Sequence, residues 1–597
     1  MRLWRSVPVA VMLTLLPGPG RAQAVRYEVS IASANAHLFH VKAEFPTAGL
    51  DTLLVSLPAW SPGNYEIQNY ARYVRHFAAQ DAAGKALFWD RLDKDTWRMG
   101  TGGTDHVTVE LDYLADDINL SMARLVSDFG EMLGTNLFLY QEGHLDRPAD
   151  VRFSLPSGWQ VATALPASDS GYHAADYHEL ADAVTFVGRF SLDSLMVDGK
   201  WIRIAVWPAE DYTPAVARNL RDGLAKQAAV QNRLMGGPPY DVYTLFFNVY
   251  HTPIQFGGGL EHSASQFDIM PAGGFADSDG TLGPFMRPLT AHEFFHLWNV
   301  KRIRPAQMWP YDYHAEQYTP LLWWSEGVTD YYADLTNWRA GLWADSDFVA
   351  SVQGNANQVA SSPEPWSEED GSVATWINEV FVNSAQLYYP KGSLTGLLMD
   401  IAIRDATDNR HSLDEVTRAL YTRFYAQGKG FRTADLLALL KEAGMPDVAD
   451  FYQRYINGRE PLPYAQILPQ AGFAVVQRST SAPFLGIQTS GPGNVIAGVV
   501  PGTAAAEAGL QSGDTLVSVG DVQVSAEQDF GPAFRDHYRG KAGQPLPIVV
   551  RRDGRTVTLT ATVQERTTTS FEITKAPQPD ARAARLWRGL ATGTVGK

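Results

Sequence analysis

One heptapeptide constrains this chain more than any other stretch: Ala291-His292-Glu293-Phe294-Phe295-His296-Leu297. On a helix, residues four apart share a face, so the two imidazoles can converge on a single metal ion. The glutamate after the first histidine can then take a proton from a metal-activated water. The plain alternative is a helix with two solvated histidines. The pattern therefore predicts a site for one Zn²⁺ ion at His292 and His296, with Glu293 as general base.

The composition narrows the class of protein without identifying a substrate. The chain has 597 residues, no cysteine and a formal net charge of -16. A length of this order favours about four domains. The negative charge argues against a nucleic-acid partner or an anionic membrane surface. The absence of cysteine is compatible with an oxidising compartment, since no thiol is left to mispair.

The first 24 residues have the pattern of a signal peptide. Arg2 and Arg5 supply positive charge, residues 9–16 are apolar, and Ala22-Gln23-Ala24 offers a cleavage site. The apolar run is too short to span a bilayer, and no other run of about 20 apolar residues follows. We therefore expect a periplasmic or secreted protein without a membrane span after signal removal. An uncleaved N-terminal anchor is the alternative.

Beyond the signal peptide, the pattern predicts a multidomain α+β protein. Residues 25–192 contain alternating segments at 25–31, 51–58 and 107–113, which are typical of a β-sandwich-like domain. Its loop at 58–65 is rich in Pro and Gly. The domain either serves the fold, which we favour, or walls one side of a substrate cleft. Residues 193–468 read as a mostly helical domain, with helices expected at 216–235, 433–444 and 448–456 and a strand at 240–250.

Residues 469–566 contain the segments Phe484-Leu485-Gly486-Ile487, Pro501 to Leu510 and Gly513 to Val519. Together these resemble a PDZ domain, whose first loop would receive a peptide carboxylate beside an open strand edge. Binding of a peptide C-terminus and a packing role alone are both open. The tail, 567–597, holds two prolines and several arginines, and we expect it to be partly disordered.

A third zinc ligand is expected after the H-E-x-x-H helix, because catalytic zinc takes three protein ligands. Glu326 opens a helical run in Trp323-Trp324-Ser325-Glu326-Gly327-Val328 and is the preferred candidate. Its alternative role is to complement a helix dipole. Asp330 lies one turn later, where it could hold the far ring nitrogen of a ligand histidine. Rival third ligands are His251, His262 and His314.

H-E-x-x-H followed by a separate Glu-Gly helix is the gluzincin arrangement. With the PDZ-like module, the set resembles the glycyl aminopeptidase family of PDZ-containing zinc metallopeptidases, and the resemblance spans nearly the whole mature chain. Such a family has a thermolysin-like catalytic domain. The spacing from His296 to Glu326 is longer than in thermolysin-like enzymes and places an insertion, 301–319, beside the site. The segments that carry the resemblance are Gly258 to His262, His292 to Asn299, Ser325 to Gly327 and Tyr388 to Gly392.

The resemblance also implies two substrate contacts. Glu261, which follows Gly258 and Gly259, corresponds to a glutamate that grips the free α-amino group, while the glycines let the substrate backbone approach. Tyr389, preferred over Tyr388, corresponds to the tyrosine that donates a hydrogen bond to the oxyanion. An exposed Glu in a glycine-rich turn and a packed aromatic pair are the alternatives.

The expected function is a zinc aminopeptidase that releases one residue from a peptide with a free N-terminus. Zinc would lower the pKa of its water to about 7, and Glu293 would move the proton to the leaving amine. The family resemblance implies a preference for small N-terminal residues such as Gly or Ala. Two alternatives stay open: a zinc endopeptidase whose PDZ domain presents protein C-termini, and a non-catalytic peptide-binding scaffold.

Overall fold

The computed structural model describes residues 23–252, 254, 257–362, 366–377, 387–489, 494–525 and 530–596. The chain divides into two compact units. The first comprises residues 1–342, 372–383 and 414–439, and the second comprises residues 343–371, 384–413 and 440–597. Both units take part of residues 193–468, so the domain boundaries expected from the sequence stay predictions. The predicted signal peptide lies outside the described residues except for its last two positions.

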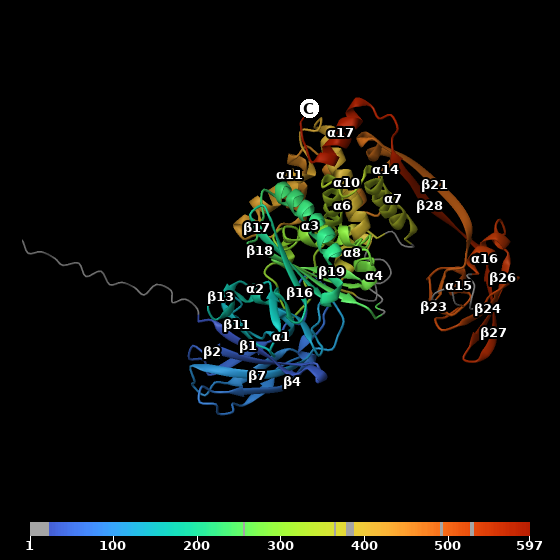
Figure 1. Ribbon diagram of the computed structural model, residues 1–597. Coiled ribbons are helices and arrows are strands. Elements are labelled where there is room, and N and C mark those ends of the chain that lie inside the picture. Colours follow the sequence, from blue (N-terminus) through green and yellow to red (C-terminus); the bar gives the residue numbers. More distant parts are fainter. Residues whose placement is uncertain are drawn as a thin grey trace, which may run out of the picture. The chain divides into compact units, whose positions relative to one another are not determined.

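The N-terminal part of the first unit is rich in strands, as predicted (Figure 1). Buried and exposed residues alternate along its long strands, so one face of the sheet packs on the core and the other meets solvent. The largest sheet has the order β13 (Ala167–Ser168), β14 (Gly171–Ala174), β11 (Ala149–Ser154), β1 (Val25–Ser33), β2 (Leu38–Pro46), β7 (His106–Leu114), β4 (Val74–Gln80).

Two smaller sheets complete this β-rich part, together with the short helices α1 (Gly134–Leu137) and α2 (Tyr177–Ala181). One has the order β10 (Tyr140–Gln141), β3 (Thr52–Ser56), β6 (Thr96–Gly100), β5 (Trp89–Arg91). The other has the order β12 (Gln160–Thr163), β15 (Val184–Gly188), β9 (Phe129–Leu133), β8 (Arg124–Leu125). Phe129 and Phe186 of the second sheet share a core cluster with Phe246 and Phe267, so the β-rich part packs directly on the next sheet of the unit.

That next sheet is mixed and carries Gly258 and Gly259 on its edge strand. Its order is β16 (Ser191–Val197), β17 (Lys200–Trp207), β18 (Val242–Tyr250), β20 (Ser265–Pro271), β19 (Gly258–Glu261). The inner pairs are parallel and β19 is antiparallel to β20. Helix α3 (Pro214–Met235) links β17 to β18. Thr213 caps its first turn and Gly236, at φ +89°, ends it, as the sequence signals predict.

Most of the described helices of the chain follow this sheet. The predicted helices at 433–444 and 448–456 are found as α12 and as α13 followed by the π-helical turn η8 (Tyr452–Ile456). No helix among the described residues is long and apolar enough to cross a membrane. The helices are α4 (Ala272–Phe275), α5 (Met286–Phe295), α6 (Val328–Arg339), α7 (Asp345–Ser361), α8 (Glu368–Ala374), α10 (Tyr388–Ala406), α11 (Leu413–Arg423), α12 (Thr433–Glu442), α13 (Val448–Phe451) and α14 (Tyr464–Ile467).

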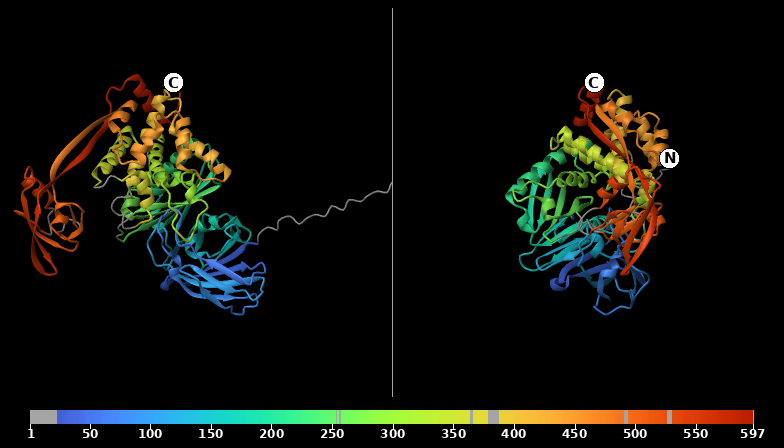
Figure 2. Two further views of the ribbon diagram at one scale, coloured as in Figure 1. Left: turned by 180° about the vertical axis from the view of Figure 1, so that it is seen from behind. Right: turned by 90° about the vertical axis from the view of Figure 1, so that its right-hand side faces the viewer.

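The tail of the chain is ordered, which corrects the expectation of partial disorder from Thr567. Strands β21 (Phe473–Phe484) and β28 (Gln564–Lys575) pair in one long antiparallel ribbon (Figure 1, Figure 2). Helix α17 (Ala581–Thr592) follows and buries Leu586 and Leu590. The amide of Asn357 on α7 exchanges two hydrogen bonds with the backbone of Phe571. The tail is ordered because it pairs with strand β21, about 90 residues earlier in the chain, and because α17 buries an apolar face. Composition alone does not reveal either contact.

Within the second unit, the ribbon leads to a small strand-rich module with its own core. Its elements are β22 (Ile487–Thr489), β23 (Ile496–Val499), α15 (Ala504–Glu507), β24 (Thr515–Val519), β25 (Val522–Gln523), α16 (Gly531–Tyr538), β26 (Pro545–Arg552) and β27 (Arg555–Thr562). Leu485, Leu516, Phe534 and Ile548 are among the residues of that core. The multidomain α+β architecture expected from the sequence is thereby confirmed.

The insertion at 301–319 is held against the β-rich part by His314. Its Nδ1 lies 3.2 Å from Asp95 Oδ1 and its Nε2 lies 2.8 Å from Glu142 Oε1. Hydrogen bonds to Asp95 and Glu142 raise the pKa of His314 to about 10, against the opposing effect of burial. The imidazole is therefore a cation at neutral pH, and it serves as an ionic clamp rather than as a metal ligand.

Removal of this clamp has a pH-dependent cost. The raised pKa means that His314 contributes its full stability below about pH 6.5, its unfolded pKa, and loses it as pH rises towards 10. The side chain is 35% exposed, so screening limits the effect to about 1 kcal/mol. We expect His314→Gln to lower the Tm most near pH 6 and hardly at all near pH 10. Thermal scans of both proteins across this range measure the difference, and a constant difference would contradict it.

Candidate metal centre and active site

Helix α5 carries both histidines of the motif in a fully buried setting. Pro288 lies in its first turn, where the missing N–H costs no helical hydrogen bond. Phe294 and Phe295 are at most 1% exposed and hold the helix in the core of the first unit. His292 lies in the last turn and His296 is the C-cap residue. The predicted pairing of the two histidines on one side of a helix is therefore found.

The hydrogen bonds of the two imidazoles leave lone pairs facing each other. His296 Nδ1 lies 2.5 Å from the carbonyl oxygen of Asn299, which can only accept, so Nδ1 carries the proton. His292 Nδ1 lies 2.7 Å from Asp330 Oδ1. In these tautomers both Nε2 atoms are acceptors, and they lie 2.9 Å apart. Two such nitrogens this close are stable only with a proton or a metal ion between them. Asp330 thus makes the contact that its position one turn after Glu326 suggested.

Glu326 completes the donor set. It lies in a π-helical turn, η5 (Trp323–Gly327), that continues into α6, and such turns are frequent at functional sites. Its Oε2 lies 3.6 Å from His292 Nε2 and 3.3 Å from His296 Nε2. Donors of a tetrahedral zinc site stand about 3.3 Å apart, given zinc–ligand distances of about 2.0–2.1 Å. The three side chains therefore fit one zinc ion, and each is at most 9% exposed.

The charges of the site favour a cation at this place. Burial lowers the pKa of His292, but the carboxylates of Asp330 and Glu326 outweigh burial and raise it well above its usual value. Burial likewise raises the pKa of Glu326, and the two imidazoles reverse the effect, so that its pKa is lowered. The carboxylates of Asp330 and Glu326 therefore stabilise positive charge at this place. A bound metal ion would supply that charge.

Glu293 points from the same helix towards the edge strand β19. A Cβ placed on Gly259 would lie 2.4 Å from Glu293 Oε1, so only glycine leaves room for the carboxylate. Burial raises the pKa of Glu293 well above its usual value, and the nearby carboxyls of Asp268 and Glu261 add to this. A carboxylate whose proton affinity is raised suits a group that must take a proton from water and then release it.

Glu261 lies at the end of β19, next to the general base. It is 4% exposed, and its Oε1 has no hydrogen-bond partner among the described residues. Ligand atoms of Glu261, Glu293 and His296 all lie within 4.8 Å of one another. A buried carboxylate with a free acceptor is costly unless a cation meets it. Strand β19 therefore places Glu261, Gly258 and Gly259 beside Glu293 and the metal donors (Figure 1 labels the strand), and their contact with a substrate stays a prediction.

The β-rich part supplies side chains that sequence reasoning missed. Its Pro- and Gly-rich loop, 58–65, reaches the metal donors, which favours the cleft-wall alternative for the domain over the purely structural one. The Tyr65 hydroxyl donates to Glu326 Oε1 at 2.8 Å. A Cβ on Gly63, which has φ +113°, would lie 2.6 Å from Glu261 Oε2. Lys301 donates to the carbonyl oxygen of Pro62 and to Asp182, both at 3.0 Å. The prolines and the glycine of this loop were the sequence signal that could have pointed to its role.

The remaining candidates are engaged elsewhere. His251 pairs with Asp211 at 2.9 Å, and His262 lies 3.1 Å from Asp182. Among the described residues, His251, His262 and His314 are not part of the metal-donor group formed by His292, His296 and Glu326. Tyr388 and Tyr389 open α10 in the second unit, with their rings stacked at 4.8 Å. The oxyanion role of Tyr389 stays a prediction.

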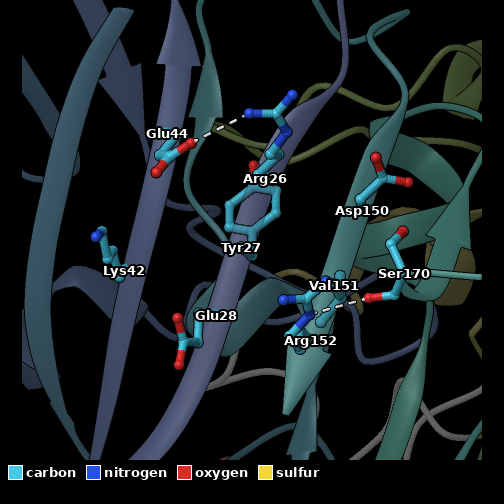
Figure 3. A pocket seen from close by; sticks show the side chains of 9 residues that line it. All are labelled: Arg26, Tyr27, Glu28, Lys42, Glu44, Asp150, Val151, Arg152 and Ser170. Atoms are coloured by element: carbon cyan, nitrogen blue, oxygen red, sulfur yellow. Dashed lines mark hydrogen bonds and ion pairs between the residues drawn. The ribbon is translucent and has the colours of Figure 1, made fainter. Parts of the chain in front are cut away.

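A surface hollow on the β-rich part is unrelated to this chemistry. Figure 3 shows it on the face of β1, β2 and β11, with a volume of about 230 Å³. Charges of both signs line it, and Arg26 pairs with Glu44 at 3.5 Å. None of the residues that line it belongs to the donor group at His292. It is a sheet face lined by charges of both signs.

Comparisons with protein families match three parts of the chain. The model of the peptidase M61 N-terminal domain matches residues 26–189. The model of the M61 glycyl aminopeptidase matches residues 286–395, which include α5 and Glu326. A PDZ domain model matches residues 476–563. None of the curated proteins compared with the chain matches it.

Solved structures support the fold. A crystal structure of an aminopeptidase N family protein from Idiomarina loihiensis is similar with a TM-score of 0.83 at 22% identity, covering 94% of this chain and 100% of that chain. An M1 zinc metallopeptidase from Deinococcus radiodurans has a TM-score of 0.47 at 15% identity, covering 74% of this chain and 95% of that one. At 22% identity the likeness to the first of these structures is one of fold alone.

The convergent donor set and the matched peptidase domain define a zinc metallopeptidase of the aminopeptidase type. Both M61 models and a PDZ model match successive parts of the chain, so the resemblance to the M61 glycyl aminopeptidases drawn from the sequence is confirmed.

Replacement of the general base separates metal binding from turnover. Glu293→Gln keeps the shape of the side chain and the three zinc donors, so zinc content should stay at one ion per chain. Loss of proton transfer should lower kcat by about 10²- to 10⁴-fold. Metal analysis and steady-state kinetics on the same preparation measure both. Full activity in a metal-checked sample would remove Glu293 from the mechanism.

Proposed function

We propose that this enzyme removes small N-terminal residues, such as Gly or Ala, from peptides with a free α-amino group. The observation that carries the proposal is the buried Glu261 carboxylate, with Oε1 unpartnered among the described residues, beside Glu293 and the zinc donors. A substrate ammonium is the cation of suitable size and charge for that place. Anchored there, the peptide presents its first carbonyl to the metal.

Zinc supplies Lewis-acid activation of water and of the peptide carbonyl. Its holders would be His292, His296 and Glu326. Glu293 takes the proton of the attacking water and passes it to the leaving amine. Tyr389 is proposed to donate a hydrogen bond to the oxyanion. Glu261 holds the substrate ammonium and so sets the register at one residue from the N-terminus.

The preference for small residues follows from how closely the loop at 58–65 covers Glu261. Gly63 lies against the Glu261 carboxylate, and Tyr65 and Trp376 are only 4% and 8% exposed. Their rings pack edge to face with centroids 6.0 Å apart. A short side chain on the first residue fits beside such a wall more readily than a branched or aromatic one.

The amine requirement is tested with Glu261→Gln, which keeps the size of the side chain and removes its charge. We expect kcat/KM on free-amine substrates to fall about 10- to 100-fold, because a charge-assisted hydrogen bond contributes about 1.5–3 kcal/mol. A fluorogenic panel of aminoacyl substrates, run with and without a chelator, measures this together with the residue preference. N-acetylated peptides are the control. Equal cleavage of acetylated and free peptides by the wild type would favour an endopeptidase.

Gly63 gives a second test with a matched control. Gly63→Ala forces a methyl group into the Glu261 carboxylate at a positive φ, so we expect kcat/KM to fall at least about tenfold. Gly49→Ala introduces similar backbone strain, at φ +81°, where nothing lies within 4 Å. This control should keep full activity, although it also loses some stability. Equal activity of the two variants would remove Gly63 from the substrate wall.

The PDZ module and the N-terminal segment lead to two further proposals, one on peptide binding and one on cellular location. In the described residues β22 pairs only with β23, which leaves an edge for an added strand. We propose that this edge receives a peptide C-terminus beside Gly486, and that the chain acts in the periplasm or outside the cell after removal of residues 1–24. Titration with C-terminal peptides and N-terminal sequencing of the exported protein test the two parts.

A further inference from the structure

The loop from Ala59 to Tyr65 is fixed at several points along its length. The amide of Ala59 donates to the carbonyl oxygen of Tyr313 at 2.7 Å, and Trp60 Nε1 donates to that of Asp312 at 2.7 Å. Lys301, which is 1% exposed, donates to the carbonyl oxygen of Pro62 at 3.0 Å. All these contacts lie within the first unit. The loop therefore has a defined place next to the metal centre.

Tyr65, at the end of this loop, lies in a backbone region that bulky residues rarely adopt. Its φ is +43°, and left-handed non-glycine residues concentrate at functional sites where the surroundings hold them. The side chain is 4% exposed, and its hydroxyl donates to Glu326 Oε1 at 2.8 Å. The other carboxylate oxygen, Oε2, is the one that lies 3.3–3.6 Å from the two Nε2 atoms.

We propose that Tyr65 is a positioning residue of the metal site. Its hydroxyl occupies Oε1 of Glu326 and thereby turns Oε2 towards the metal. Asp330 does the same for His292, and the Asn299 carbonyl does so for His296. Each of the three donors then has one partner that sets its orientation. For Glu326 that partner comes from the β-rich N-terminal part, 261 residues earlier in the chain.

A competing explanation is that the Tyr65 ring only fills space. The ring packs against Trp376 with centroids 6.0 Å apart, and this contact survives replacement by phenylalanine. Tyr65→Phe therefore separates the two explanations, because it removes the hydroxyl and keeps the ring. In the variant, Oε1 of a carboxylate that is 3% exposed loses a donor, and the carboxylate is less well oriented for the metal.

The experiment is a zinc dissociation constant for the full-length protein, measured by competition with a chelating dye at fixed pH. We expect Tyr65→Phe to weaken zinc binding by about 10- to 100-fold, as loss of a ligand's supporting hydrogen bond does. Asp330→Asn serves as the benchmark for the equivalent contact on His292. In the cobalt-substituted protein, Tyr65→Phe should also change the visible absorption bands, which report ligand geometry.

Tyr70→Phe is the matched control. Its hydroxyl is equally buried and lies 2.8 Å from Ser61 Oγ in the same loop, and Tyr70 is not the residue that meets Glu326. We expect its zinc affinity to stay within about twofold of the wild type. If Tyr65→Phe also stays within twofold, with unchanged cobalt bands, the positioning role is wrong. These readouts depend on the metal site alone, so they stand whether or not the enzyme prefers small N-terminal residues.

A measurement on the wild type covers the case in which Tyr65→Phe folds poorly. If the loop and the metal site are coupled through Tyr65, zinc must slow hydrogen exchange in residues 60–68 as well as in α5. Zinc-free and zinc-loaded protein are compared by mass spectrometry. Protection confined to α5 and α6, with no change in residues 60–68, would overturn the proposal.

Discussion

The structure depends on how one small buried volume accommodates several carboxyl groups. Glu261, Glu293, Glu326 and Asp268 are each at most 4% exposed, and each is near the others on β19, β20, α5 or η5. Four like charges cannot all be carried there, because unpaired buried charges are strongly destabilising. Burial raises the pKa of Asp268 to about 8, so this group is mainly neutral at pH 7. Glu326 and Glu261 then need cations, whereas the raised pKa of Glu293 means that this group more readily carries a proton.

On the proposed function, these cations are the zinc ion and the ammonium group of the substrate, and each takes part in the reaction. Glu326 faces the two imidazoles and the place of the zinc ion, while Glu261 keeps an oxygen free for the substrate ammonium. Glu293 lies between them, and its raised pKa follows from the same crowding. On the proposed function, substrate binding and charge neutralisation are one event. On that proposal, a peptide with a blocked N-terminus would lack the ammonium that pairs with Glu261, near which the buried Lys301 already supplies one positive charge.

The sequence was informative wherever the partners are local or belong to a motif. The helix of His292 and His296, the carboxylate of Glu326 and the support from Asp330 all follow from helical spacing. Tyr65 and Gly63 could not be derived in this way, because they meet Glu326 and Glu261 across about 200 residues or more of chain. The same limit explains the error for residues 567–597. Their order depends on β21 and on the helical core of the second unit, and composition carries no information about either.

The loop at 58–65 ties the two substrate-defining carboxylates to one rigid segment. Gly63 lies against Glu261 and Tyr65 donates to Glu326, with only one residue between them. On the proposed function, this short segment contacts both the amine anchor and the metal ligand and so helps to set their separation. That separation decides how many residues fit between the ammonium and the scissile carbonyl. Since Lys301 holds this loop from the catalytic side, the N-terminal domain acts as a part of the active site, and a displacement of it would disturb metal and amine binding together.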